Sequence, residues 1–127
     1  MTTSHLQHLA TLAPELASAA KASLDYWSPE PTPPTVLAGD LARSLVANVE
    51  FLRPSTLRSV FDLCETAILE GSAEEQAAFA TGFLEGLQHA DGRGDFDFRT
   101  VAGFLGPTSK AHCQAMDRFH CARTRGL

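Results

Sequence analysis

Helical periodicity is strongest in VLAGDLARSLVANVEFL, which spans residues 36–52. Its aliphatic side chains recur at steps of three and four positions: Leu37, Leu41, Leu45, Val49 and Leu52. Because an α-helix has about 3.6 residues per turn, these side chains share one face, and a globular fold buries such a face. The stretch therefore predicts an amphipathic helix.

A proline-rich segment, SPEPTPPT at residues 28–35, precedes this helix. Prolines lack a backbone donor and favour extended geometry, so the segment predicts a stiff connector between two helical segments. Upstream of it, we expect a kink or a short turn near Pro14, followed by a helix over about residues 14–26. Leu16, Ala20 and Leu24 would form its buried stripe.

Further helices are predicted over about residues 55–70, 72–90, 98–105 and 108–124. Gly71 is expected to end the first of these in a left-handed conformation, and Ser72 with Glu75 predicts a capping box. The expected core side chains are Leu57, Val60, Phe61, Cys64, Ala67, Ile68, Phe79, Phe83, Leu84, Leu87, Ala111, Ala115, Met116 and Phe119.

Two glycines, Gly82 and Gly86, lie four residues apart inside the helix predicted over 72–90. Interior glycines destabilise a helix by about 1 kcal/mol each relative to alanine, so we expect a neighbouring helix to approach them closely. With short connections throughout, residues 1–127 predict one all-α domain, a compact irregular bundle of five to six helices.

Composition restricts the function. The 127 residues carry a net charge of −5, which argues against general binding of nucleic acid. We expect no membrane span and no secretory signal, because the chain lacks a long apolar run and a basic start. Its three cysteines are odd in number and lack CxxC spacing, which is typical of reduced thiols in the cytoplasm.

The charge is unevenly distributed, with nine acids and two arginines between residues 54 and 97. One interpretation is a solvated set of helix faces. The other is an acidic surface that steers a basic protein partner. The candidate partner-binding residues are Glu65, Glu70, Glu74, Glu75, Asp91, Asp95 and Asp97.

Catalytic and metal chemistry are weakly indicated. Cys113, Asp117, His120 and Cys121 are metal-ligand types on one predicted helix, but one helix seldom provides tetrahedral geometry, and no CxxC or HxxxH pair accompanies them. The neighbours His112 and Cys113 point about 100° apart on a helix, which disfavours a nucleophile–base pair. We therefore expect no catalytic residues, metal or cofactor.

Glu85 lies within an apolar helical run, between Leu84 and Leu87. A buried acid needs donors, so we interpret it as a structural polar tie. The expected donors are the backbone amides of the turn at residues 106–109, Arg99 or Arg118.

Two motifs carry a family resemblance. The pair FLEGL at residues 83–87 and FLGPT at 104–108 resembles the "F-L-E-x-L … L-G-P" arrangement of a family of small helical bacterial proteins of uncharacterised function. VLAGDLAR at 36–43 is similar to the "x-L-G-D-L-x-R" segment of that family.

The resemblance implies an accessory or immunity protein encoded beside secreted toxins, with no established catalytic residues. We accordingly expect a cytoplasmic protein that binds and neutralises a cognate toxin by occluding it. The alternative is a helical adaptor or regulatory domain, with homo-oligomers possible. An enzyme or metal protein using the Cys and His residues is a third hypothesis.

Overall fold

The computed structural model describes residues 4–127 and is helical throughout, with no strand in this range. Counted with α5, η2 and α6 as one continuous helix, it has six helices of seven residues or more and a short seventh. The elements are α1 (His5–Thr11), α2 (Pro14–Trp27), α3 (Pro34–Asn48), the 3-10 turn η1 (Val49–Phe51), α4 (Pro54–Glu70), α5 (Ala73–Ala77), the π-helical segment η2 (Ala78–Leu84), α6 (Glu85–Gly92), α7 (Arg99–Ala102) and α8 (Pro107–His120). The all-α, irregular bundle is confirmed.

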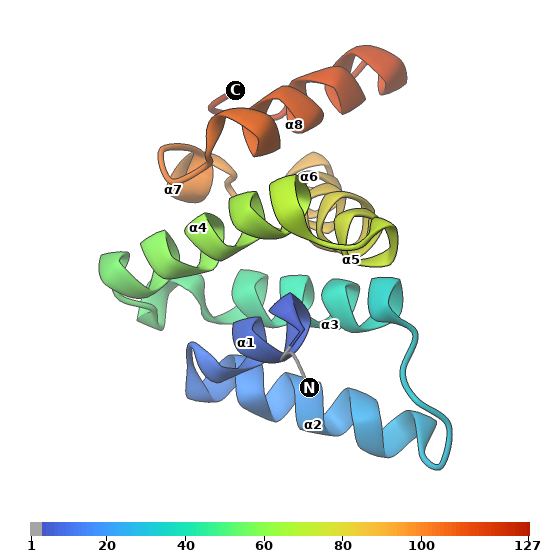
Figure 1. Cartoon of the computed structure of the whole chain (residues 1–127). Coiled ribbons are helices and arrows are strands. Elements are labelled where there is room, and N and C mark those ends of the chain that lie inside the picture. Colours follow the sequence, from blue (N-terminus) through green and yellow to red (C-terminus); the bar gives the residue numbers. More distant parts are fainter. Residues whose placement is uncertain (1–3) are drawn as a thin grey trace.

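The helices are stacked from α2 at one end of the molecule to α8 at the other, and α1 lies against α2 and also contacts α4 (Figure 1). α3 lies between α2 on one side and η2 with α6 on the other, and α8 packs against α4 and α6 at the far end. The N-terminal and C-terminal parts of the chain therefore lie at opposite ends of the stack. No helix of residues 4–127 combines the length and the apolar character that crossing a bilayer requires.

Proline sets the starts of four helices. Pro14, Pro34, Pro54 and Pro107 each occupy the first turn of a helix, where the missing N–H has no helical partner to lose. The predicted bounds shift accordingly. The connector is shorter than the predicted 28–35, because α3 already begins at Pro34. A turn separates α1 from α2 before Pro14, and α8 ends at His120 rather than near 124.

The buried side chains form one cluster, in which Phe61, Phe79, Phe83 and Phe98 are the largest that are fully buried. Three expected core residues are exposed, and Ile68, Ala115 and Met116 are only half-buried. Leu24 is 49 % exposed and Phe119 is 77 % exposed, while Ala111 also faces solvent. In α8 the buried residues are instead Ser109 and Cys113, since only the first part of this helix covers the core.

The two interior glycines mark a close helix contact, as predicted. A Cβ on Gly82 would lie 2.6 Å from the Thr35 carbonyl oxygen and 2.8 Å from the Ala38 Cβ. A Cβ on Gly86 would lie 3.2 Å from the Ala42 Cβ. The absent side chains thus let α3 approach η2 and α6 almost backbone to backbone.

Two predictions at the junction of α4 and α5 were wrong in part. Gly71 has φ −72° and ψ 168°, an extended rather than left-handed conformation. A Cβ there would collide with the Ala67 carbonyl oxygen, which is why glycine suits the position. Ser72 does cap α5, since its Oγ accepts from the Glu75 N–H at 3.1 Å. The Glu75 side chain does not complete a capping box with the Ser72 N–H. Its carboxylate accepts from the His5 N–H (2.6 Å) and His5 Nδ1 (3.0 Å) instead.

Candidate functional site

A cavity of about 560 Å³ separates α6 from the end of α8 and the tail that follows it. We call it the α6–α8 cavity. Glu85, Gln88 and His89 line it from α6, His120 from the last turn of α8, and Thr124 from the tail. Side chains at positions i, i+3 and i+4 share a helix face, so α6 presents the first three to α8 together.

Glu85 contacts a neighbouring helix, but its partner is none of the donors expected. Glu85 Oε2 lies 3.0 Å from His112 Nε2 of α8, and the Glu85 side chain is only 14 % exposed. The amides at residues 106–109 belong to another acid, Glu65. The sequence could not distinguish the two, because both α4 and α6 direct a carboxylate towards α8.

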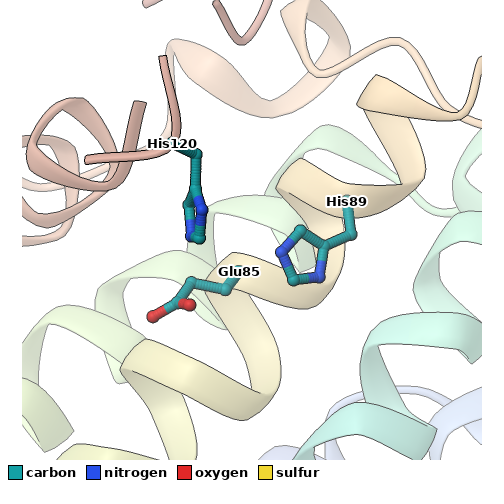
Figure 2. Close-up of side chains that lie close together, drawn as sticks. All are labelled: Glu85, His89 and His120. Atoms are coloured by element: carbon teal, nitrogen blue, oxygen red, sulfur yellow. The ribbon is translucent and has the colours of Figure 1, made fainter. Parts of the chain in front are cut away.

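The cavity gathers a carboxylate and two imidazoles. The nearest potential ligand atoms of Glu85, His89 and His120 all lie within 4.8 Å of one another. In Figure 2, His89 and Glu85 project from neighbouring turns of α6, and His120 reaches towards them from the other side of the gap. His89 and His120 are exposed, whereas Glu85 is half-buried. These three residues could hold a metal ion or exchange protons with a bound molecule.

The metal-ligand types on the last helix, Cys113, Asp117, His120 and Cys121, do not converge on one point in the described residues 4–127, in line with the expectation that they form no metal site. Cys113 is buried, and its burial, with the nearby charges of Asp117 and Glu85, raises the pKa of its thiol to about 12. Asp117 accepts from the Thr124 hydroxyl (2.7 Å) and backbone N–H (2.9 Å), which fastens the tail to α8. Cys121 is exposed in a left-handed conformation with φ 52°. His120 alone joins the Glu85–His89 pair.

Glu65 of α4 caps the start of α8. Its carboxylate accepts from the backbone N–H groups of Thr108 (2.9 Å) and Ser109 (2.8 Å) and from the Ser109 hydroxyl (2.8 Å). Partial burial alone would raise the pKa of this carboxyl, but these hydrogen bonds outweigh it and hold the pKa below its ordinary value. Gly106 makes the arrangement possible, since any Cβ there would collide with the Glu65 side chain.

Of the other predicted partner-binding acids, three form ion pairs with arginines and two have exposed carboxylates without such a pair within residues 4–127. Asp91 is buried, accepts from the Phe98 N–H (2.9 Å) and pairs with Arg125 (2.8 Å). Asp97 pairs with Arg99, whose hydrogen bonds lower the pKa of the Asp97 carboxyl to about 2. Asp95 forms an exposed pair with Arg93 at 3.1 Å. Glu70 and Glu74 are exposed, and within residues 4–127 their carboxylates have no hydrogen bond or ion pair.

An exposed apolar surface lies where α2 ends and α3 begins. Tyr26 is 85 % exposed and Trp27 36 %, with their rings edge to face at 6.4 Å. Val36, which is 38 % exposed, extends the surface. We call these three residues the α2–α3 patch. A shallow cavity there is lined by Tyr26, Trp27 and Val36 together with the ion-paired Asp40 and Arg43.

Sequence reasoning missed His89, the pairing of His112 with Glu85, and the α2–α3 patch. One signal was available, since Glu85-x-x-x-His89 has the i, i+4 spacing that places two ligands on one helix face. The contact between Glu85 and His112 spans 27 residues and depends on how α6 and α8 pack, which no local pattern encodes.

The contact between Glu85 and His112 predicts a modest effect on the stability of the fold. Glu85→Gln keeps the volume and one hydrogen bond to His112 but loses the charge, so we expect the free energy of unfolding to fall by about 1 kcal/mol. Urea denaturation followed by circular dichroism measures it. Glu74→Gln on exposed α5 is the control and should remain within about 0.5 kcal/mol of the parent. Equal stability of all three proteins would show that the pair contributes nothing.

Comparison with known proteins places the chain in a family. The model of a family described as "Domain of unknown function (DUF7674)" matches residues 6–121, which include every helix that lines the α6–α8 cavity and carries the α2–α3 patch. Neither the curated proteins nor the solved structures yielded a match. The chain therefore belongs to the DUF7674 family.

Proposed function

We propose that this chain is a non-catalytic protein-binding domain whose docking surface is the α2–α3 patch. One observation carries the proposal: Tyr26 and Trp27 stand together, exposed, at the end of α2. When a partner covers the exposed apolar area of tryptophan and tyrosine, the free energy of the system falls. Together with arginine, these residue types contribute most of the binding energy of protein interfaces. Arg43 lies at the edge of the same surface.

The partner that we propose is the one implied by the sequence resemblance, a secreted toxin. The chain acts in the bacterial cytoplasm as an immunity protein that binds a cognate secreted toxin and occludes it. Glu70 and Glu74 would contribute to steering a basic partner, since their charges have no internal partner among residues 4–127. Glu65, Glu75, Asp91 and Asp97 support this role less, because the fold already uses their carboxylates.

The test is binding to the product of an adjacent toxin gene. We expect a one-to-one complex, with protection of cells that express the toxin. Trp27→Ala and Tyr26→Ala should each weaken binding by tenfold or more, as expected for a residue that contributes about 1.4 kcal/mol or more. Phe51→Ala is the matched control, because Phe51 is a 71 % exposed aromatic residue outside the patch. Its binding should equal that of the parent.

Either of two outcomes would contradict the proposal. If no neighbouring gene product binds or is neutralised, the immunity function is wrong. If a complex forms but the Trp27 and Tyr26 variants bind like the parent, the docking surface is wrong.

The same patch also favours the alternative, a helical adaptor that associates with a second copy of itself. Two exposed aromatic surfaces can cover each other across a two-fold axis. Light scattering distinguishes this case, because a dimer that Trp27→Ala converts to a monomer would identify the patch as a homodimer interface.

A further inference from the structure

We propose that Glu85, His89 and His120 bind one divalent transition-metal ion of the zinc class in the α6–α8 cavity. Nothing in the proposed protein-binding function requires this site, which lies on α6 and α8 rather than on α2 and α3. The donor set, its geometry and the contacts that hold α6 against α8 support this site.

The donor set suits zinc. One carboxylate oxygen and two imidazole nitrogens are ligands that Zn²⁺ accepts, and three protein ligands leave a fourth position for water. Mg²⁺ and Ca²⁺ prefer oxygen ligands, so a site with two imidazoles selects against them.

To bind one metal ion, the ligand atoms of the three residues must move slightly closer to one another. Zinc–nitrogen and zinc–oxygen bonds of about 2.0–2.2 Å place tetrahedral ligand atoms about 3.4 Å apart. The ligand atoms of the three residues are already within 4.8 Å of one another, from both walls of the gap (Figure 2). Because His89 and His120 are exposed, rotation of their side chains can close this difference without disturbing the core.

His112 orients the carboxylate. Its Nε2 lies 3.0 Å from Glu85 Oε2, and among residues 4–127 the other carboxylate oxygen has no hydrogen bond. Ligating groups in metal sites are commonly held in this way by a second residue that does not touch the metal. One oxygen of Glu85 is thus fixed by α8, and the other remains available as a ligand.

Gln88 holds α6 to α8 and to the tail beside the three ligands. It lines the same cavity and is only 8 % exposed. Its Nε2 donates to the Cys113 carbonyl (2.9 Å) of α8 and to the Thr124 hydroxyl (3.1 Å) of the tail. The helices that carry the three ligands are therefore held together in the absence of metal.

The experiment uses the full chain without a histidine tag, stripped of metal by a chelator and dialysed. Titration calorimetry with ZnCl₂ should show one bound ion per chain, and elemental analysis should find the same ratio after dialysis. Zinc should also raise the melting temperature, because a ligand that binds only the folded state stabilises it.

Matched variants locate the site. His89→Ala and His120→Ala should each lower zinc affinity by at least about tenfold, the lower limit seen even for residues that only support a ligand. Both side chains are exposed, so the variants should fold. His8→Ala is the control, because His8 is an exposed histidine on α1 outside the cluster, and it should bind zinc like the parent.

Imidazole NMR provides a second readout. Zinc should shift the ring signals of His89 and His120 and leave those of His8 in place. The site is overturned if the stripped protein takes up no zinc, if the double variant of His89 and His120 retains it, or if His8→Ala loses it to the same extent. Trp27→Ala should bind zinc normally, so this proposal and the proposed function fail independently.

Discussion

Glu65→Ala is expected to lower the free energy of unfolding by about 3 kcal/mol. The Glu65 carboxylate accepts three hydrogen bonds at the start of α8, two of them from backbone N–H groups. Hydrogen bonds to a charged group contribute about 1.5–3 kcal/mol, and the helix dipole adds to them. Without the carboxylate, the buried Ser109 would keep donors with no acceptor. Chemical denaturation measures the loss.

Glu70→Ala is the control for this variant. Glu70 is an exposed acid on the same helix, α4, so its removal should change stability by no more than about 0.5 kcal/mol. If Glu65→Ala and Glu70→Ala are equally stable, Glu65 does not anchor α8.

The lowered pKa of Glu65 gives the same interaction a pH signature. The carboxyl binds protons more readily in the unfolded chain, so its contribution is complete above the ordinary glutamate pKa of about 4.3. It is lost as the pH falls through the lower pKa of the folded state. Glu65→Gln has no such proton to bind, so the difference in melting temperature between parent and variant should shrink from neutral pH towards pH 3. A constant difference would contradict the assignment.

Gly82→Ala is expected to be destabilising by about 2–3 kcal/mol. Its Cβ would lie 2.6 Å from the Thr35 carbonyl oxygen, and a backbone atom cannot move aside as a flexible side chain can. Overpacking of this kind costs about 1–3 kcal/mol or more, which exceeds the gain in helix propensity. Thermal and urea unfolding would both report the change.

Gly92→Ala is the matched control, because Gly92 is also helical but has no atom within 4 Å of an added Cβ. This variant should be neutral or more stable by up to about 1 kcal/mol, since alanine restricts the unfolded chain. Destabilisation of equal size at both positions would indicate that close packing of α3 on η2 is not the reason for glycine at 82.

The sequence predicted the helices well because their signals are local. Periodic leucines and the prolines near helix starts act locally, and both match the structure, although α3, α4 and α8 begin at the proline itself, one or two residues before the predicted start. Periodicity failed at Phe119 and Leu24, because it identifies a face but not where the neighbouring helix ends. Both residues lie near the end of their helix, and both are exposed.

The candidate site was harder to predict because its contacts are long-range. Glu65 and Glu85 both point towards α8, yet one caps its amides and the other meets His112. Residue types alone cannot separate the two, since either acid satisfies the same donors. His89 and His120 lie 31 positions apart in the chain, and only the packing of α6 against the end of α8 brings them together.

The π-helical segment η2 sets the rotational phase of α6. Its hydrogen bonds reach back five residues, as the bond from the Glu85 N–H to the Ala80 carbonyl shows. Deleting one residue from this segment would restore an ordinary α-helical register and turn everything after it by about 100°. Phe79 would keep its place in the core, while Glu85 and His89 would swing away from α8. One surplus residue in a helix therefore determines whether its carboxylate and imidazole meet the imidazoles opposite.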